Sequence, residues 1–546
     1  APRADHAQPI ARSPARRATF MLSLPPLLAA RRALRPRGRF FLLGILTLLL
    51  STQLAHGANP SRPPNIVLIY TDDLGYGDVG CYGATKVRTP HIDRLAREGR
   101  RFTDAHSASA VCTPSRYALL TGEYPFRTNR WNAIFANVGL IVDPAKTTLA
   151  SLLKRKNYAT ACFGKWHLGL GNKIPDWNGD LKPGPLELGF DYYFGLPTVS
   201  SHSPFVWVEN HRVLGLDPAD PLVFGGTPPT LPFPEKILTH QPISGGKAAH
   251  ALYQDTELGT TLTEKAVAWI RAKKDAPFFL YFATPQIHHP FTPHPRFQGT
   301  SDCGRYGDFI HELDWMVGEV LATLDDLKLT EHTLVIFTSD NGGMLNEGGQ
   351  DAWRAGHRAN GDWLGYKFGA WEGGHRVPFI ARWPGKIPQA TTSDALICSI
   401  DLLATLAAVT QQTLTATEGP DSFNQLATLT GSPAPPIRSH LVLAPNSPKH
   451  LTLRSHSWVY ISAPGDGGFT GIRGGPGSVA FSQRRHSDIT PDGKIKDDAP
   501  SAQLYDLAHD PQQTTNVIRE HPAVADQLQR QLQQLRTTRR TAPPSS

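Results

Sequence analysis

Two apolar runs of the sequence each end in a pair of oxygen-bearing side chains. Asp72 and Asp73 follow the run Asn-Ile-Val-Leu-Ile-Tyr, and Asp340 and Asn341 follow the run Leu-Val-Ile-Phe-Thr. Adjacent carboxylates repel each other and gain most from a shared cation. Ligands of open α/β sheets collect at the carboxyl ends of the strands. The two pairs therefore predict one hard-cation site for Ca²⁺ or Mg²⁺, and the lack of His and Cys disfavours zinc there.

A third segment, residues 112–116, has the sequence Cys-Thr-Pro-Ser-Arg. Proline suits the first turn of a helix, so Pro114 predicts that Cys112 lies at a helix N-terminus. Backbone N–H groups and the helix dipole favour a thiolate or a bound anion at that position. Arg116 is placed to pair with a tetrahedral oxyanion. Taken alone, however, a cysteine in this setting is more typical of a buried structural thiol.

These side chains need strands that end at a common edge of a sheet. Helical spacing of apolar residues in 90–99 and 309–324 predicts amphipathic helices between such strands. The alternation predicts an α/β fold, a large mostly parallel sheet flanked by helices on both faces. The strands, rich in apolar and β-branched residues and expected to be buried on both faces, are 65–70, 158–164, 278–283 and 334–338.

After about residue 430 the pattern changes to short strands (451–453 and 458–461) and a terminal amphipathic helix. This predicts a smaller C-terminal α+β domain with a short antiparallel sheet. Two stretches, 197–250 and 342–374, lack a sustained period and predict long loops. We divide the chain into a leader (1–58), a main α/β domain (59–430), a C-terminal α+β domain (431–536) and a disordered tail (537–546).

The net charge of +8 belongs to the leader, because residues 1–58 hold nine Arg, no Lys, no Glu and a single Asp. The remainder is close to neutral, so we expect no nucleic-acid partner. The Arg-rich stretch precedes an apolar run, 40–50, and then small residues, which is the order of a cleaved secretion signal. The run is too short for a comfortable membrane span. We expect a secreted or periplasmic protein without a stable span after signal removal, and an uncleaved anchor is the alternative. Met21 is an alternative first residue of the signal.

The segment 112–122, Cys-Thr-Pro-Ser-Arg followed by Tyr-Ala-Leu-Leu-Thr-Gly, closely resembles the signature of type I, formylglycine-dependent sulfatases of the alkaline phosphatase superfamily. In that family the signature Cys is oxidised to formylglycine. The likeness spans roughly residues 64–536, but it departs at His91, where the family has Asn, and 197–250 aligns to nothing. Further segments that resemble the family pattern in chain order are 65–75, 89–96, 164–169, 338–342, 372–378 and 504–511.

The resemblance implies an arylsulfatase-type sulfuric ester hydrolase that acts on sulfate monoesters. One hydroxyl of the hydrated aldehyde attacks sulfur and the second expels sulfate, a step that a thiol or serine cannot perform. Family precedent favours Ca²⁺ over Mg²⁺, and a formylglycine-generating maturation enzyme becomes a necessary partner. The family's metal ligands map onto Asp72, Asp73, Cys112, Asp340 and Asn341.

The resemblance also implies roles for basic residues. Arg116, Lys165 and Lys367 match the groups that bind formylglycine and sulfate oxygens, and His167 matches the base that deprotonates the second hydroxyl. Family spacing selects His288 as the acid for the leaving group, with the adjacent histidine, His289, as the near alternative. Loop residues that are candidates to line a pocket for a sugar or an aromatic alcohol are His202, His211, His250, His357, Trp207 and Trp363.

Two other functions fit much of the same pattern. A phosphonate or phosphate ester hydrolase of the superfamily would keep the aldehyde and the metal. A non-catalytic sulfated-glycan binder with unmodified Cys112 would have no use for the proton-transfer residues, which disfavours it. The sequence leaves open whether the substrate is a sulfated small molecule or a sulfated glycan, the oligomeric state, and whether any of the five cysteines pair.

Overall fold

The computed structural model describes residues 62–225, 243–432 and 435–543, so the leader and its apolar run lie outside the described residues. From Arg62 onward the chain forms one compact unit. All four strands predicted from the sequence are present, each within one residue of its expected ends: β1 (Asn65–Thr71), β4 (Ala159–Lys165), β10 (Phe278–Ala283) and β11 (Thr333–Ser339).

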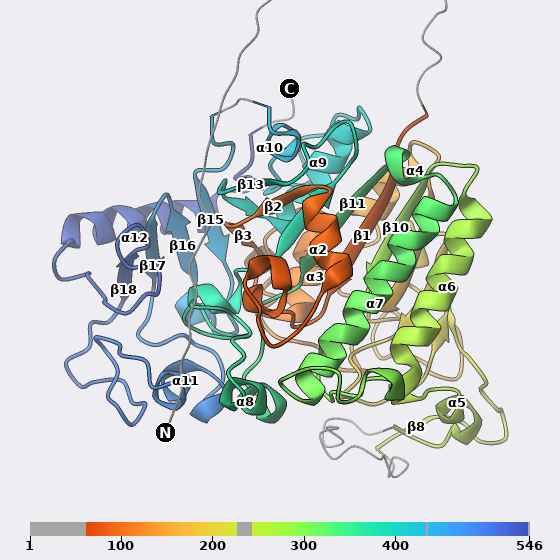
Figure 1. Cartoon of the computed structure of the whole chain (residues 1–546), viewed down its shortest axis with the longest axis horizontal. Coiled ribbons are helices and arrows are strands. Elements are labelled where there is room, and N and C mark those ends of the chain that lie inside the picture. The colour runs from red at the N-terminus through yellow and green to blue at the C-terminus, as the bar shows by residue number, and fades with distance from the viewer. Residues whose placement is uncertain (1–61, 226–242, 433–434, 544–546) are drawn as a thin grey trace, which may run out of the picture. The chain divides into compact units, whose positions relative to one another are not determined.

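These strands form the centre of a ten-stranded sheet in the described part of the chain (Figure 1). Its order is β13-β2-β12-β11-β1-β10-β4-β5-β6-β7. The strands β11, β1, β10, β4 and β5 run parallel, whereas β12 pairs antiparallel with β11. The mostly parallel sheet is thus confirmed. The other strands are β2 (Arg100–Phe102), β5 (Tyr192–Leu196), β6 (Val208–Glu209), β7 (Arg212–Val213), β12 (Phe379–Arg382) and β13 (Thr391–Ser393).

Helices cover both faces of this sheet, as predicted. Because successive side chains of a strand point to opposite faces, β1 supplies both cores: Val67 and Ile69 pack on one side, Leu68 and Tyr70 on the other. The helices α6 and α7 lie side by side over the first face (Figure 1). The first face carries α2 (Pro90–Arg97), α6 (Leu258–Lys273) and α7 (Arg305–Asp326), and the second carries α3 (Cys112–Thr121), α4 (Leu149–Lys154) and α9 (Leu402–Val409).

The predicted C-terminal α+β module is also present. Its antiparallel sheet has the order β15-β16-β17-β18, and the terminal helix α12 (Pro522–Thr537) packs on it through Leu528 and Leu532. The module meets the main sheet's loops where Ala110 N–H donates to the carbonyl oxygen of Ala444, 3.2 Å away. The strands are β15 (His440–Leu443), β16 (Thr452–Ser455), β17 (Trp458–Ile461) and β18 (Gln503–Asp506).

Residues 537–543 differ from the disordered tail expected for them. The N–H groups of Thr541 and Ala542 both donate to the carbonyl oxygen of Pro420, at 3.0 and 3.1 Å. The Arg540 guanidinium donates to the carbonyl oxygens of Ala416 and Glu418. The polar composition that suggested disorder instead supplies hydrogen bonds to a neighbouring loop.

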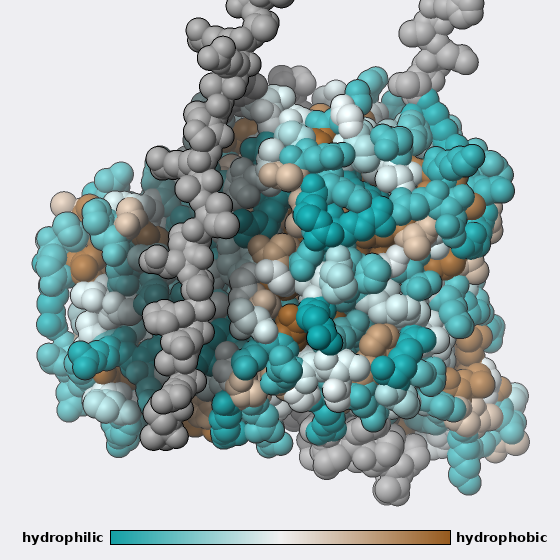
Figure 2. All heavy atoms as spheres, viewed as in Figure 1, coloured by the Kyte–Doolittle hydropathy of each residue, from teal (hydrophilic) through white to brown (hydrophobic). Residues whose placement is uncertain are grey.

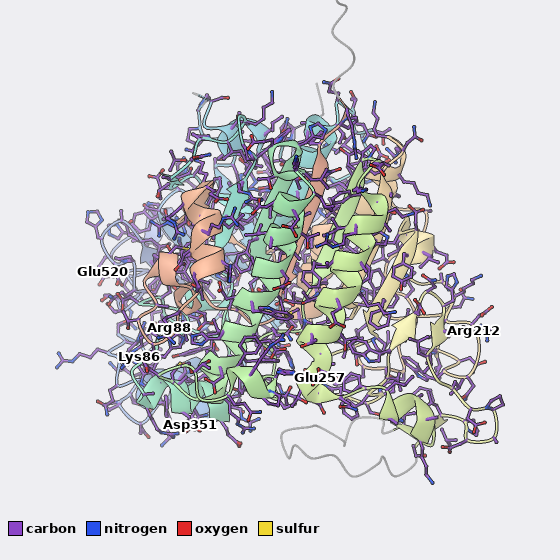
Figure 3. All side chains as sticks on the ribbon, turned by 45° about the vertical axis from the view of Figure 1, so that its right-hand side comes forward. Lys86, Arg88, Arg212, Glu257, Asp351 and Glu520 are labelled. Atoms are coloured by element: carbon purple, nitrogen blue, oxygen red, sulfur yellow. The ribbon has the colours of Figure 1, made fainter. Side chains whose placement is uncertain are left out.

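Where the structure describes the two expected loop regions, they hold only short elements. The face of the molecule seen in Figure 1 is mainly hydrophilic (Figure 2). Charged side chains such as Glu257, just before α6, and Asp351 on α8 are labelled in Figure 3. None of the helices in the described part of the chain combines the length and the apolar character needed to cross a bilayer. The remaining elements are β3 (Ala105–His106), β8 (Val223–Phe224), β9 (Ile243–Ser244), β14 (Ile397–Cys398), α5 (Lys247–Ala251), α8 (Glu347–Arg354), α10 (Leu426–Thr430) and α11 (Gly475–Phe481).

Candidate active site

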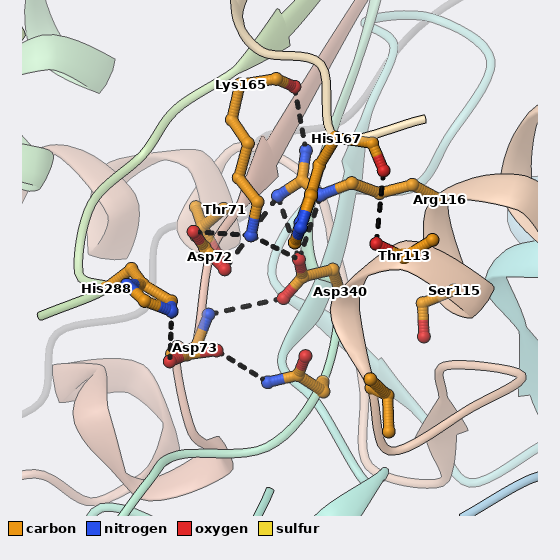
Figure 4. A network of polar contacts seen from close by, with 12 residues as sticks. Thr71, Asp72, Asp73, Thr113, Ser115, Arg116, Lys165, His167, His288 and Asp340 are labelled. Atoms are coloured by element: carbon orange, nitrogen blue, oxygen red, sulfur yellow. Dashed lines mark hydrogen bonds and ion pairs between the residues drawn. The ribbon is translucent and has the colours of Figure 1, made fainter. Parts of the chain in front are cut away.

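The carboxyl ends of β1 and β11 bring the predicted oxygen ligands together (Figure 4). Asp72, Asp73 and Asp340 each place a carboxylate oxygen within 4.8 Å of the others. The Asn341 amide donates from Nδ2 to Asp73 Oδ1 at 2.9 Å, so Asn341 belongs to the same cluster. Parallel pairing of the two strands, which sets Thr71 opposite Ser339, is what aligns these pairs at one edge.

Three buried oxygens of the cluster, Asp72 Oδ1, Asp73 Oδ2 and Asn341 Oδ1, accept no hydrogen bond from any described residue. Buried acceptors almost always have a partner. The grouping of these three oxygens is therefore the arrangement expected of ligands for a cation. Burial raises the pKa of Asp72 and of Asp340, and the mutual repulsion of their carboxylates adds to the rise for Asp340. An oxygen-only donor set fits Ca²⁺ or Mg²⁺, and such an ion would keep both carboxylates charged.

Three cations balance the three carboxylates. Although burial opposes the charged form, the carboxylates raise the pKa of Arg116 and of Lys367. These contacts pre-position cationic groups around a place where an anionic sulfate group can bind. The pairs are Arg116 Nη2 with Asp340 Oδ2 at 2.8 Å, Lys165 Nζ with Asp72 Oδ2 at 2.7 Å, and Lys367 Nζ with Asp73 Oδ1 at 2.6 Å.

Gly164 explains how Lys165 reaches this site. Its φ of +110° lies in the region that favours glycine, and a Cβ there would sit 2.0 Å from the carbonyl oxygen of Ala283 in β10. Only glycine therefore allows β4 to pair so closely with β10 at this point. The close pairing delivers Lys165 at the carboxyl end of β4, beside the carboxylates of β1.

Cys112 is the first residue of α3, as the proline pattern predicts, and its side chain is buried. Burial raises the pKa of the thiol and outweighs the opposing influence of Lys165 and Lys367. The unmodified residue is therefore a neutral thiol rather than the thiolate that a helix N-terminus favours. A neutral buried thiol is a poor nucleophile, so the position needs chemical activation to serve in catalysis.

His167 follows β4 and holds a left-handed backbone conformation, with φ of +57°. Its Nε2 lies 2.8 Å from the carbonyl oxygen of Ile134. Burial, followed by the charge of Lys165, lowers the pKa of His167 well below its usual value, so the ring is neutral. A carbonyl only accepts, so Nε2 carries the hydrogen and Nδ1 carries the lone pair, which has no partner among the described residues.

His288 and His289 stack on each other with ring centroids 4.4 Å apart. His288 Nδ1 donates to the carbonyl oxygen of His289 at 2.6 Å, which leaves Nε2 only 3.8 Å from Asp73 Oδ2. Burial lowers the pKa of both rings, that of His289 to about 3, with Lys367 as the second cause in each case. Both rings place a nitrogen within 4.8 Å of an Asp73 carboxylate oxygen, and His288 is the one whose Nδ1 is held by a backbone carbonyl.

The cluster opens into a cavity of about 820 Å³ whose walls include Cys112, His167, His288 and Lys367. Of the six loop residues suggested from the sequence, all in the described part of the chain, only His202 lines this cavity. Trp207 instead packs on Phe194 within the core, as expected for the burial of a large apolar ring. The others bind elsewhere: His357 to Asp78, His211 to Glu187, His250 to the Gly246 carbonyl and Trp363 to Arg376.

The sequence did not reveal that the C-terminal module contributes to the cavity. Phe469 and Arg473 line it, and the Phe469 ring packs against Phe368, next to Lys367, with centroids 4.1 Å apart. Their segment, 465–477, is rich in glycine and has no periodic pattern, so its composition was the sole local signal of a loop. Phe135, Phe291 and Arg305 add further aromatic and cationic side chains to the wall.

Comparison with known proteins identifies the family of this chain. Residues 64–412 match the family model described as Sulfatase. The chain belongs to the sulfatase family. It is 40% identical over 506 residues to an N-acetylgalactosamine-6-O-sulfatase of Bacteroides thetaiotaomicron, a match that covers 87% of this chain and 94% of the relative. It is 34% identical to human arylsulfatase A over 85% of each chain.

Solved structures extend the comparison. A structure from work on glycosaminoglycan metabolism by Bacteroides thetaiotaomicron has a TM-score of 0.77 and 39% identity, and the match covers 88% of this chain and 100% of that one. The phosphonate monoester hydrolase of Agrobacterium radiobacter has a TM-score of 0.55 but only 17% identity over 87% of this chain and 96% of its own, so it shares the fold alone. The enzyme is therefore a sulfuric ester hydrolase, as the sequence resemblance implied.

Proposed function

We propose that this sulfatase works through a formylglycine made from Cys112 and a Ca²⁺ ion held by Asp72, Asp73, Asp340 and Asn341. The observation that carries the proposal is the group of three partnerless buried oxygens beside Cys112. Cys112 lies close enough to Asp72, Asp340 and both lysines for each to influence the pKa of its thiol. Sulfatases generally use both a metal ion and formylglycine, and Mg²⁺ is the alternative ion for the same oxygens.

A bound cation would neutralise charge on a sulfate oxygen, and formylglycine would supply two hydroxyl groups on one carbon. Arg116, Lys165 and Lys367 bind the remaining sulfate charge, since each already holds its cationic group beside the cluster. His167 accepts a proton at Nδ1, because Nε2 is committed to the Ile134 carbonyl. The base is thus fixed in both tautomer and direction.

His288 is the proposed acid for the leaving alcohol. Its Nδ1–H is held by the His289 carbonyl, so only Nε2 can deliver a proton towards the cluster. Burial and Lys367 lower the pKa of His288, whereas the negative charge of a bound sulfate ester would raise it again. Proton uptake at His288 is therefore coupled to substrate binding. His289, with its unpartnered Nδ1 on the same cavity, is the alternative donor.

The proposed substrate is a sulfated glycan, specifically a 6-O-sulfate on N-acetylgalactosamine. The relative with 40% identity carries that activity in its name, and the match covers nearly all of both chains. The cavity supports this choice because it combines aromatic rings with amide and cationic side chains, which suits a sugar with polar substituents. Its amide-bearing residues are Asn132, Asn346 and Asn446.

The proposal includes export and maturation. The Arg-rich leader and apolar run of residues 1–58 support a secreted or periplasmic protein, and a formylglycine-generating enzyme would have to act on Cys112 along that route. Sequencing the N-terminus of mature protein from the native host tests the first point. A mature chain that still begins within residues 1–39 contradicts the cleaved signal.

Two measurements test the chemistry. A mass spectrum of the peptide around Cys112 is expected to show the aldehyde, and an intact thiol in active enzyme would overturn the nucleophile. Rates are then compared on 6-O- and 4-O-sulfated N-acetylgalactosamine, an aryl sulfate and the matched aryl phosphonate. The 6-O-sulfate is expected to react fastest; preference for the phosphonate would favour the other hydrolase class, and binding without turnover would favour a glycan binder.

A further inference from the structure

A second cluster of buried ionisable groups lies apart from the sulfate site. His106 in β3, together with Glu372 and His375, places ligand atoms within 4.8 Å of one another. Their exposed fractions are 0%, 0% and 1%. None of these residues is among the groups assigned to the cation or the sulfate.

The two histidines of this cluster face each other with identical atoms: Nδ1 of His106 and Nδ1 of His375 are 3.0 Å apart. The Nε2 atom of His106 lies 2.9 Å from Asp104 Oδ1, and that of His375 lies 3.2 Å from the carbonyl oxygen of Ala370. Both oxygens are acceptors, so each ring uses its N–H at Nε2. The two Nδ1 lone pairs would then face each other across 3.0 Å, an arrangement that is stable only with a shared proton or a metal ion between the rings.

Glu372 supplies a second, independent indication. Its Oε2 accepts from Arg376 Nε at 2.8 Å, but its Oε1 accepts no hydrogen bond from any described residue. The nearest ion-pair partner of Oε1 is Arg454 Nη1 at 3.6 Å, beyond hydrogen-bond distance. A fully buried carboxylate oxygen without a partner is strongly disfavoured, and this one belongs to the same cluster as the two facing nitrogens.

The charged groups around the cluster sum to zero, so they do not repel a cation there. With one hydrogen each, at Nε2, the rings of His106 and His375 carry no net charge. The charged side chains around them are two carboxylates and two guanidinium groups, which cancel. These four are Asp104, Glu372, Arg376 and Arg454.

We propose that His106, His375 and Glu372 form a second metal site that takes Zn²⁺. Imidazole nitrogen and carboxylate oxygen are ligands that zinc prefers, and they fill three of its four positions, leaving one for water. Nitrogens on a tetrahedral zinc lie about 3.3 Å apart, so the observed pair needs to separate by only a few tenths of an ångström. Hydrogen bonds from Nε2 to a carboxylate and to a backbone carbonyl are those that orient metal-bound histidines.

A zinc ion at this cluster would support the catalytic centre from outside. Ser107 N–H donates to the carbonyl oxygen of His375 at 2.9 Å, within the segment that leads to Cys112. Gly342 N–H donates to the carbonyl oxygen of Gly374 at 2.9 Å, next to Asn341. A metal at this cluster would therefore link the segment that leads to Cys112 with the segment that contacts Gly342, next to Asn341. It would do so without contacting the substrate.

The test uses the full-length enzyme as purified and measures its zinc by mass spectrometry. Wild type is expected to hold about one zinc per chain, and His106→Gln and His375→Gln are expected to lose it. His486→Gln, which changes a buried histidine bound to Tyr505 instead, is the matched control and should keep its zinc. Asp340→Asn should also keep its zinc, because it alters only the sulfate-site cation.

Cobalt and heat provide readouts that do not depend on stable histidine variants. Stripped wild type given Co²⁺ is expected to show the visible bands of a tetrahedral nitrogen-containing site, and added Zn²⁺ should raise its melting temperature. The proposal is overturned if wild type shows no zinc, no cobalt bands and no thermal shift. A proton shared by the two rings would then explain their close contact. Zinc retained in both folded histidine variants overturns it as well.

Discussion

His167 donates its Nε2–H to the carbonyl oxygen of Ile134 at 2.8 Å, and this one bond decides which atom of the ring can act as a base. The lone pair is left on Nδ1, which has no partner among the described residues and belongs to a side chain on the cavity wall. In the proposed mechanism, the loop that carries Ile134 contributes through its backbone, because its carbonyl fixes the tautomer of His167.

His167→Asn is expected to lower kcat by about 10²–10⁴-fold, as for the loss of a general base. If the base acts in the second half of the reaction, alcohol is released in a rapid burst and sulfate follows slowly. Stopped-flow detection of both products from an aryl sulfate checks this. His211→Asn, which changes a partly buried histidine paired with Glu187 outside the cavity, is the control. Equal slowing of both products would contradict the assignment of His167 to the later step.

Asn341→Ala is expected to weaken Ca²⁺ binding by about 10–100-fold, because it removes one of the partnerless oxygens and the amide that orients Asp73. Calcium-dependent activity and the calcium-induced rise in melting temperature measure the change. Asn132→Ala alters another amide on the cavity wall and should leave calcium binding as it is. Calcium affinity unchanged in Asn341→Ala would remove that residue from the ligand set.

Phe469→Ala and Arg473→Ala are expected to raise KM for a sulfated glycan several-fold, since both side chains line the cavity and neither belongs to the cation cluster. The KM for a small aryl sulfate should change little because such a substrate has no sugar ring for these side chains to contact. Ile472→Ala, an exposed change in the same segment, is the comparison. An equal rise in KM for both substrates would show that the segment supports the site as a whole and does not recognise the glycan.

Glu312→Gln is expected to stabilise the enzyme at pH 8 but not at pH 4. Burial raises the pKa of Glu312 to about 8, against 4.5 for an exposed carboxyl. Between these values the folded state keeps a proton that the unfolded state has lost, so the contribution of Glu312 to stability falls as pH rises from 4.5 to 8. Glutamine has no such proton, and we expect a gain of about 1–2 kcal/mol at pH 8.

Thermal unfolding across that pH range measures the effect. Glu331→Gln serves as the control because it removes the same type of charge from an exposed position. A melting temperature of Glu312→Gln that tracks the wild type at every pH would show that Glu312 is ionised in the folded enzyme.

The sequence predicted the strands of the central sheet well because each is a short apolar run buried on both faces, as β1 shows with every residue buried. It also predicted that residues 72, 73, 340 and 341 would meet, since parallel strands end at one edge. Prediction failed where a residue's surroundings come from distant segments. Trp207 and His357 looked like pocket residues, yet one packs on Phe194 and the other binds Asp78.

The sequence by itself determined the fold class, the family and the residue types at the catalytic centre, because local periodicity and motif spacing are written in consecutive residues. Only the tertiary structure decided which atoms of those residues are available. The Ile134 carbonyl sets the tautomer of His167, the C-terminal module brings Phe469 and Arg473 to the cavity, and His106 meets His375 across distant segments. Hydrogen-bond directions and contacts between remote segments depend on packing, which no local pattern of side chains specifies.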